Sequence, residues 1–178
     1  MLDKSLNYGR HLVKKFLKQS IPYTKVLDVG AGNGSDLFLA QMVNRNSDLH
    51  ALEYYPPNIS LLKSCGISVS SIDIEKETFP FDDGSFDIII ANQILEHTIE
   101  LFWIFHEITR TLKIGGKIII GVPNLASLHN RLLLLLGRQP TSIQLASAHI
   151  RGFTKVDLLN FVNVCWPDGY KLNNWGGS

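Results

Sequence analysis

Apolar positions recur every three or four residues near the start of the chain, a spacing that predicts a helix. Lysines take one face of this helix, and the apolar face carries Leu12, Val13, Phe16 and Leu17. Pro22 then interrupts the pattern, because proline lacks the backbone N–H that a helix interior requires. We therefore expect an N-terminal helix within residues 1–20.

From residue 25 onward, short apolar runs that predict strands alternate with segments that predict helices. The predicted strands are 25–30, 48–55, 67–74, 86–94 and 116–124, and the predicted helices are 35–43, 58–64 and 101–112. Such alternation predicts an α/β fold with a mostly parallel sheet and helices on both faces. The strands are nearly continuous Val, Ile and Leu runs, as expected when both faces of a sheet are covered.

The remaining residues predict an insertion followed by a helix and one more strand. Residues 125–153 form the insertion, which contains a run of leucines. Thr154 and Asp157 have the spacing of a capping box, so we expect a helix over 154–162. Residues 170–178 have the pattern of a sixth strand.

Composition narrows the class of protein. A length of 178 residues suits a single domain over 1–178, and a hydrophobic content of 45% suffices for one core. The formal net charge of +1 gives no nucleic-acid signature. The two cysteines lack metal-binding spacing, so no metal is expected. Without a signal-peptide core or a run of about 20 apolar residues, we expect a cytoplasmic protein with no membrane span.

The stretch VLDVGAGNGSD, residues 26–36, carries the first functional signal. It joins a predicted strand to a predicted helix, and its glycines allow a ligand to approach the backbone closely. The free N–H groups at the start of the following helix favour an anionic or polar ligand group. In parallel α/β sheets, ligands bind at the carboxyl ends of the strands.

Two features indicate which ligand binds at this turn: the spacing of its glycines and the acidic residues that end the next two strands. Gly30, Gly32 and Gly34 read G-x-G-x-G, whereas a dinucleotide site requires G-x-G-x-x-G. Glu53 ends the second strand about twenty residues on, where a carboxylate can accept from two ribose hydroxyls. Asp73 lies at the end of the third predicted strand and could accept from an adenine amine. Glu53 alone does not separate the ligands, because NAD sites use the same carboxylate.

Together these pieces resemble the class I S-adenosylmethionine-dependent methyltransferases. VLDVGAGNG looks like their first motif, DIEKETFPFDDGSFDIIIANQILEHT is similar to their run through the fourth strand, and EITRTLKIGGKIIIGVPN resembles their fifth strand and its helix. The match covers roughly residues 25–124. A narrower similarity through VPNLASLHNRLLLLLGRQP and HIRGFT looks like the methyltransferase type 11 and MetW-like bacterial proteins.

The resemblance implies a Rossmann-like methyltransferase fold and a set of cofactor-binding residues. The cofactor would be S-adenosyl-L-methionine, and the product S-adenosyl-L-homocysteine. Asp28 would place the amino-acid end, Glu53 would bind the ribose, and Asp73 would bind the adenine amine. The full implied set is Asp28, Gly30, Ala31, Gly32, Asn33, Gly34, Glu53, Tyr54, Asp73, Ile74, Asn92 and Gln93.

The resemblance implies no fixed catalytic residue, because positioning alone can lower the barrier of methyl transfer. His97 and His149 are the candidate general bases, and Arg151 could bind an anionic group of the acceptor. Tyr8 could touch the cofactor. Residues 125–153 would form an acceptor-side lid, and the leucines there would pack it or cover an apolar acceptor. The family's sheet usually has seven strands, so we expect the last C-terminal strand to be missing.

Three function classes remain open at this point. The first is a methyltransferase whose acceptor is a sugar, a lipid-linked precursor or another metabolite. The second is a methyltransferase-like module that binds the cofactor and acts through a partner protein, and a homodimer is equally compatible with the sequence. The third is an NAD-dependent oxidoreductase, which the glycine spacing disfavours.

Overall fold

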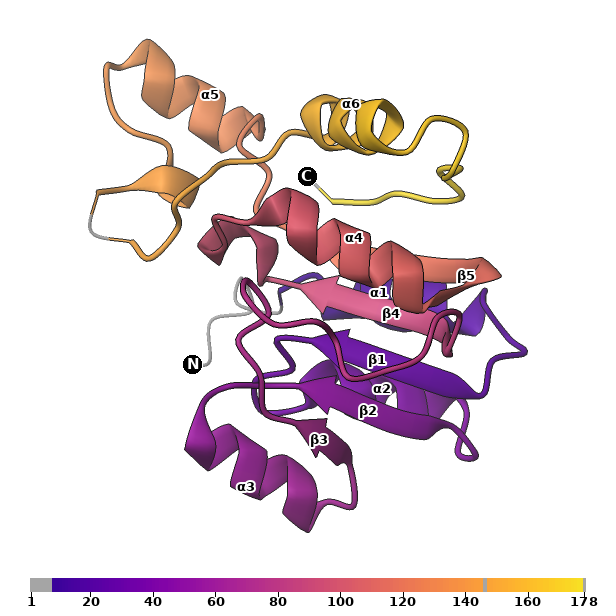
Figure 1. The fold of residues 1–178 in the computed structure, drawn as a ribbon. Helices are drawn as coiled ribbons and strands as arrows, with labels where there is room; N and C mark the ends of the chain where they lie inside the picture. Colours follow the sequence, from indigo (N-terminus) through magenta and orange to yellow (C-terminus); the bar gives the residue numbers. More distant parts are fainter. Residues whose placement is uncertain (1–7, 146, 178) are drawn as a thin grey trace. The chain divides into compact units, whose positions relative to one another are not determined.

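Five parallel strands form one sheet in the order β3-β2-β1-β4-β5 (Figure 1). The strands are β1 (Lys25–Val29), β2 (Asp48–Leu52), β3 (Ser68–Ser70), β4 (Phe86–Asn92) and β5 (Leu112–Gly121). The structure is a computed structural model and describes residues 8–145 and 147–177. The parallel α/β fold predicted from the sequence is thereby confirmed.

The described chain divides into two compact units. The first contains the residues up to Ile94 together with Glu100–Gly121, and so holds the whole sheet. The second contains Leu95–Ile99 and the residues from Val122 onward. Among the described residues, no helix combines the length and the apolar character that crossing a membrane requires.

Helices cover both faces of the sheet in the first unit. They are α1 (Arg10–Lys18), α2 (Ser35–Val43), α3 (Pro56–Ser64) and α4 (Leu101–Thr111). Figure 1 shows α1 and α2 behind the strands and α4 in front of them. The predicted N-terminal helix is confirmed over Arg10–Lys18, with Val13 and Leu17 buried, whereas residues 1–7 lie outside the described part.

Alternate residues of the strands build the core on the two faces. Val26, Ile88 and Ile90 share one buried cluster with residues of α1 and α2. Leu27 and Ile89 are fully buried at the intervening positions, which point to the opposite face. This alternation explains why the strand sequences are apolar throughout.

The strand register places the carboxyl ends of β1, β2 and β4 side by side. Asp28 pairs with Ala51 on one side and with Ile90 on the other, and Val29 pairs with Leu52. The ends of β1, β2 and β4 therefore lie next to one another. The residues that follow these strands are neighbours in space although they are far apart in the sequence.

Several predicted boundaries were wrong. The third strand was expected over 67–74 but spans only Ser68–Ser70. The fifth strand begins at Leu112 rather than at residue 116, because a bulge places Leu112 opposite Phe86 and Lys117 opposite Ile88. Helix α3 begins at Pro56, which suits a first helical position where no N–H partner is needed.

The predicted sixth strand is also wrong. Residues 166–177 contain no strand in the structure, and Ser178 lies outside the described residues. The sheet therefore has five strands among the described residues. The helix predicted over 154–162 is confirmed as α6 (Lys155–Cys165), and the Thr154 hydroxyl accepts a hydrogen bond from the Asp157 amide as its N-cap.

The second unit contains α6 together with shorter elements. These are the 3₁₀ turns η2 (Leu95–His97) and η3 (Thr141–Ile143) and the helix α5 (Leu128–Leu135). Asn130 is buried and ties the insertion together, because its amide donates to the Asn124 carbonyl and accepts from the Thr141 N–H. The leucines of the insertion are mostly exposed, among them Leu128, Leu132, Leu134, Leu135 and Leu136.

Candidate functional site

The glycine turn between β1 and α2 is the centre of the candidate site. Gly30, Gly32 and Gly34 all have positive φ, at 71°, 55° and 79°. A Cβ at Gly30 would stand 2.6 Å from Ile94, and one at Gly34 would stand 2.5 Å from Leu62. A Cβ at Gly32 would meet no atom within 4 Å. Gly30 and Gly34 therefore serve packing, and Gly32 faces open space where a ligand can approach the backbone.

Glu53 borders this open space and holds the turn. Its carboxylate accepts hydrogen bonds from the N–H groups of Gly32 at 2.6 Å, Tyr54 at 2.9 Å and Tyr55 at 2.8 Å. The residue is only 9% exposed. A carboxylate has about four acceptor positions, so three bonds to the backbone leave about one for a ligand.

A buried polar cluster lies beside the turn. Asn92, at the end of β4, donates through Nδ2 to Asp36 Oδ2 at 2.9 Å. Arg10 Nε lies 3.5 Å from Asp36 Oδ1, which makes an ion pair between α1 and α2. Asn92 Oδ1, Asp36 Oδ1 and Arg10 Nε are buried and form no hydrogen bond within the described structure, although the last two form the ion pair. Buried polar groups normally form hydrogen bonds, so this group of atoms at one edge of the sheet is a candidate ligand site.

Asp28 is the most deeply buried of the acids at this edge of the sheet. Burial raises its pKa well above the usual value, and the nearby carboxylates of Asp36 and Glu53 raise it further, while Arg10 lowers it. A carboxyl group in this setting favours a neighbouring positive charge. The sequence interpretation named Asp28 and Asn92 but missed Asp36 and Arg10, although Asp36 opens the helix after the glycine turn.

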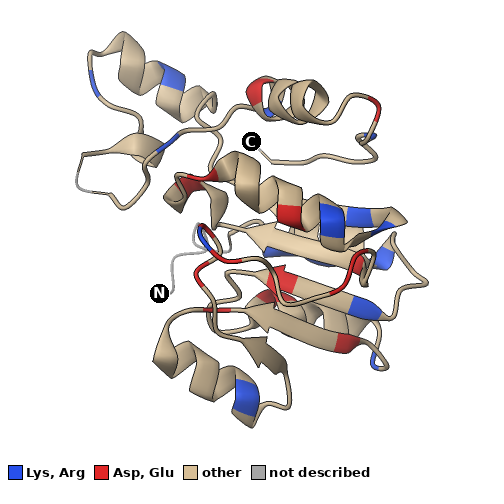
Figure 2. Cartoon of the chain, viewed as in Figure 1, with Lys and Arg blue, Asp and Glu red and all other residues tan. Residues whose placement is uncertain are grey.

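The remaining predicted cofactor residues lie at the same edge, where Figure 2 shows acidic segments in the loops after the strands. Asp73 lies three residues beyond the end of β3, and its carboxylate binds Lys76 Nζ at 2.7 Å and the Glu75 N–H at 3.1 Å. The hydrogen bond from Lys76 lowers the pKa of Asp73. Ile74 is partly buried, and Tyr54 is 72% exposed.

Gln93 adds a feature that the sequence did not reveal. It has φ of 59°, in the left-handed region that residues other than glycine rarely adopt. Its N–H donates to the Gly121 carbonyl at 2.7 Å, which holds this conformation at the end of β4. Uncommon backbone conformations of this kind concentrate at functional sites.

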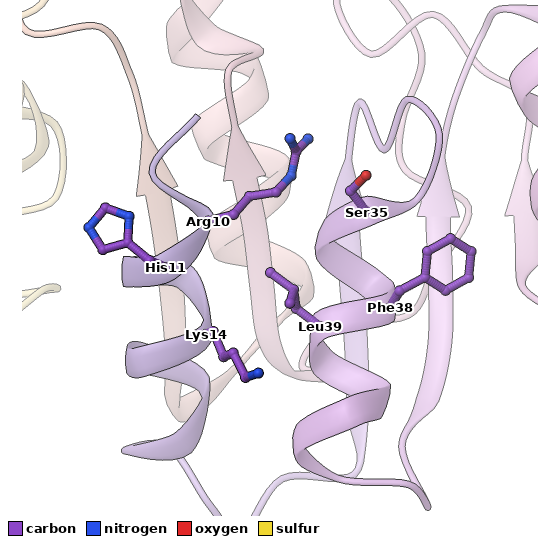
Figure 3. A pocket seen from close by; sticks show the side chains of 6 residues that line it. All are labelled: Arg10, His11, Lys14, Ser35, Phe38 and Leu39. Carbon is purple, nitrogen blue, oxygen red and sulfur yellow. The ribbon is translucent and has the colours of Figure 1, made fainter. Parts of the chain in front are cut away.

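A groove between α1 and α2 adjoins the buried cluster (Figure 3). It has a volume of about 450 Å³ and is lined by Arg10, His11, Lys14, Ser35, Phe38 and Leu39. Figure 3 shows Arg10 extending from α1 towards the first turn of α2, where Ser35 lies. The lining does not include Glu53, Asp73 or Asn92. The groove thus meets the candidate site only through the start of α2 and Arg10.

The two candidate bases lie together in the second unit. The rings of His97 and His149 have centroids 4.8 Å apart at 68°. Glu96, beside them, is 1% exposed, and burial raises its pKa, an effect that its own backbone N–H and the two histidines partly oppose. Arg151 donates through Nη2 to the Ile99 carbonyl at 2.7 Å. Tyr8 lies in the first unit, with its ring centroid 5.2 Å from the Arg10 guanidinium carbon.

The fold defines a class of protein. A SAM-dependent methyltransferase from Archaeoglobus fulgidus superposes with a TM-score of 0.65 at 20% identity, over 88% of this chain and 68% of that chain. A methyltransferase from Haloferax volcanii, solved in complex with the activator Trm112, superposes with a TM-score of 0.63 at 18% identity, over 90% and 68%. The chain therefore has the fold of the class I methyltransferases, as the sequence predicted.

The sequence places the chain more narrowly. The family model for the methionine biosynthesis protein MetW matches residues 10–173, and the chain belongs to this family. A ubiquinone biosynthesis O-methyltransferase from Xanthomonas oryzae is 28% identical over 106 residues, which cover 56% of this chain and 43% of that protein. The chain spans less than half the length of the curated relatives it matches.

Proposed function

We propose that this protein is a cytoplasmic methyltransferase that uses S-adenosyl-L-methionine and methylates a small-molecule acceptor. The acceptor is a sugar, a lipid-linked precursor or another metabolite, and residues 1–178 act as one methyltransferase domain. The observation that carries the proposal is the open side of Gly32 next to the Glu53 carboxylate. Membership of the MetW family and the printed names of the similar methyltransferases support it.

The residues at this edge fit the cofactor group by group. The Arg10 guanidinium matches the carboxylate of the methionine part, and the acids Asp28 and Asp36 match its ammonium group. The Glu53 carboxylate matches the ribose hydroxyls. The Asp73 carboxylate matches the adenine amine, and Ile74 supplies an apolar neighbour for the ring. Asn92 and Gln93, which end β4, would border the sulfonium.

Glu53 must change partners when it binds a ribose. Two ribose hydroxyls need two acceptor positions on the Glu53 carboxylate. Three backbone N–H groups already occupy three of its about four positions, which leaves about one. The Gly32 N–H is the bond to exchange, because Gly32 is also the residue whose backbone faces open space. Binding would thus free this N–H to face the ligand.

When bound, the cofactor supplies an electrophilic methyl group on a positively charged sulfur. The task of the protein is to hold that group in line with the acceptor and to exclude water, which can lower a barrier by about 7–11 kcal/mol in the best cases. An acceptor hydroxyl or amine can also lose its proton to a base. His97 and His149 are the candidates for this step, and no general base is assigned between them.

An alternative function is a cofactor-binding module that acts through a partner. The exposed leucines of α5 and of the residues after it favour this alternative, because large apolar side chains in such number often mark an interaction surface. The Haloferax volcanii methyltransferase in complex with Trm112 is an example of a similar fold with a protein partner. Turnover of a methyl acceptor by the isolated chain would exclude this alternative.

Calorimetric titration tests the proposal. The purified chain is titrated with S-adenosylmethionine, S-adenosylhomocysteine and NADH. We expect the two sulfur compounds to bind and NADH not to bind. Glu53→Ala should weaken binding at least about tenfold, the size expected when a hydrogen bond to a charged group is lost.

Asp82→Ala is the matched control, because Asp82 is an exposed acid that precedes β4 at the opposite end of that strand. This variant should bind like the unmodified chain. Binding of NADH alone would replace the methyltransferase proposal with the oxidoreductase alternative. Equal loss in Asp82→Ala would mean that Glu53 is not a ligand of the cofactor.

A further inference from the structure

Three groups that can bind a metal ion meet in the second unit. Glu96 and His97 lie on η2, and His149 lies in the segment after η3. His149 is 52 positions beyond His97 in the sequence. One ligand atom from each residue lies within 4.8 Å of those from the other two. None of the functions discussed above uses all three residues.

The backbone contacts of the histidines indicate which ring nitrogen carries a proton. His97 Nδ1 lies 3.1 Å from the Ala148 carbonyl, and His149 Nδ1 lies 2.8 Å from the Ser142 carbonyl. A carbonyl can only accept, so each Nδ1 carries the proton and donates it. In the neutral imidazole, Nε2 then keeps a lone pair. Histidines that bind metals are oriented in this way, with the second ring N–H bonded to a carbonyl or carboxylate.

Glu96 supplies an independent observation. Both of its carboxylate oxygens are buried, and no other residue of the described structure donates a hydrogen bond to either of them. A buried carboxylate with so few partners is costly, because it loses its hydration and gains little in exchange. Its neighbours at the cluster are the imidazoles of His97 and His149. A carboxylate between two imidazoles is stabilised by a proton or by a cation, and a divalent ion can bind all three groups at once.

The main chain holds the two segments of the cluster against each other. The Ile150 N–H donates to the Glu96 carbonyl at 2.9 Å, directly beside His149. Arg151 binds the Ile99 carbonyl two residues after His97. These contacts keep the ligand set in place although it is discontinuous in the sequence.

We infer that Glu96, His97 and His149 bind one zinc ion through the carboxylate and the two Nε2 atoms. Two histidines and one carboxylate form a common ligand set for zinc and for other divalent transition metals. Three protein ligands leave a fourth position open for water or for an oxygen of an acceptor. This assignment replaces the general-base role considered for His97 and His149, and it does not depend on the methyltransferase proposal.

The geometry needs a modest contraction to close around the ion. Bonds of about 2.0–2.2 Å in a tetrahedral site place ligand atoms about 3.3 Å apart. The present separations, up to 4.8 Å, therefore have to shorten by up to about 1.5 Å. His97 is exposed, so its ring has room to move.

Zinc binding by the full chain tests the inference. The protein is stripped with a chelator, dialysed and titrated with zinc chloride by calorimetry. We expect one ion per chain, and affinity at least about tenfold weaker in His97→Ala, His149→Ala and Glu96→Gln, in line with the loss of a ligand. His129→Ala is the control, because His129 is an exposed histidine of the same unit outside the cluster. Its affinity should equal that of the unmodified chain.

Three results would overturn the inference: no zinc binding, unchanged binding in both histidine variants, or an equal loss in His129→Ala. Circular dichroism checks that each variant is folded, and if Glu96→Gln is not, the two histidine variants decide. Titration with S-adenosylhomocysteine in parallel keeps the two proposals separate. Zinc binding without binding of the sulfur cofactor would contradict only the proposed methyltransferase function.

Discussion

The Gly32 N–H donates to the Glu53 carboxylate at 2.6 Å and so joins the turn after β1 to the end of β2. This bond spans 21 positions of the sequence and fixes the one glycine of the three in this turn that faces open space. In the glycine turn, Gly32 therefore gives a ligand access to the backbone, whereas Gly30 and Gly34 allow close packing of side chains. Alanine substitutions can distinguish these two roles.

Gly32→Ala should separate ligand binding from stability. Its φ of 55° is strained for alanine, which costs about 1 kcal/mol, but the added methyl group meets no atom of the protein. Gly34→Ala adds a collision with Leu62 at 2.5 Å to the same backbone strain. We expect Gly32→Ala to lose S-adenosylhomocysteine binding with a small loss of stability, and Gly34→Ala to unfold more easily. Urea unfolding measures the stability of each variant, and calorimetry measures its affinity for S-adenosylhomocysteine. Equal losses of stability in the two variants would contradict the different roles of Gly32 and Gly34.

A pH-dependent contribution to stability comes from Asp87. Burial alone would raise its pKa, but hydrogen bonds from Lys113, the Lys25 N–H and Thr24 outweigh burial and lower the pKa below the usual value. A lowered pKa in the folded state stabilises the protein above the unfolded pKa of about 3.9. This stabilisation is lost as pH falls from that value through the folded pKa.

Asp87→Asn should therefore cost about 1.5–3 kcal/mol at pH 7, the size of hydrogen bonds to a charged group. The difference between the two proteins should shrink as the pH is lowered below about 4. Unfolding in urea at a series of pH values measures it. Asp82→Asn, at an exposed acid, should show no such trend, and a constant difference for Asp87→Asn would refute the role of its ionisation.

The loop before β4 depends on a buried ion pair. Arg110 donates from Nε and Nη2 to the two oxygens of Glu107 at 3.0 and 2.7 Å, and it also binds the Phe79 and Phe81 carbonyls. Glu107 in turn accepts from the Phe79 N–H. Burial would raise the pKa of Glu107, but the Arg110 and Phe79 hydrogen bonds outweigh it and lower the pKa.

Removing Arg110 leaves the buried Glu107 carboxylate without its cation, so Arg110→Ala should cost about 3–5 kcal/mol. Glu107→Ala should cost less, about 1.5–3 kcal/mol, because Arg110 keeps Asp83 and the Phe79 and Phe81 carbonyls as partners. Arg110→Lys keeps the charge but loses the planar fork, so it should also destabilise, by less. A double-mutant cycle with Arg110→Ala should give a coupling energy of about 0.5–3 kcal/mol. Additive losses in the cycle would show that the two side chains do not act as a pair.

The sequence predicted the features that depend on neighbouring residues, and it missed those that depend on contacts between distant parts of the chain. Local periodicity located every strand of the sheet, and the residues that end β1, β2 and β4 followed from the alternation of elements. The early start of β5 was missed, because the bulge opposite Phe86 depends on pairing between two strands. Arg10 and Asp36 were missed for the same reason, since only packing of α1 against α2 brings them together.

The cluster of Glu96, His97 and His149 could not be predicted from the sequence for the same reason, because it also depends on contacts between distant parts of the chain. Metal-binding spacings are recognised in a sequence when the ligands lie a few positions apart, whereas α4, β5 and most of the insertion lie between His97 and His149. Each histidine alone is an ordinary candidate base. Their common orientation depends on the carbonyls of Ser142 and Ala148, which only the folded chain supplies.

Gly121 and Asn92 provide a test of the buried cluster at the end of β4. A Cβ at Gly121 would stand 1.9 Å from Asn92 Oδ1, so Gly121→Ala must displace that side chain. The displacement would break the Asn92–Asp36 hydrogen bond and disturb the site proposed for the methionine part of the cofactor. We expect Gly121→Ala and Asn92→Ala to weaken S-adenosylhomocysteine binding to a similar degree. Because both act through one side chain, the double variant should bind no more weakly than Asn92→Ala alone. Calorimetry on the three variants measures this, and additive losses would mean that Gly121 acts on the cofactor by a route other than Asn92.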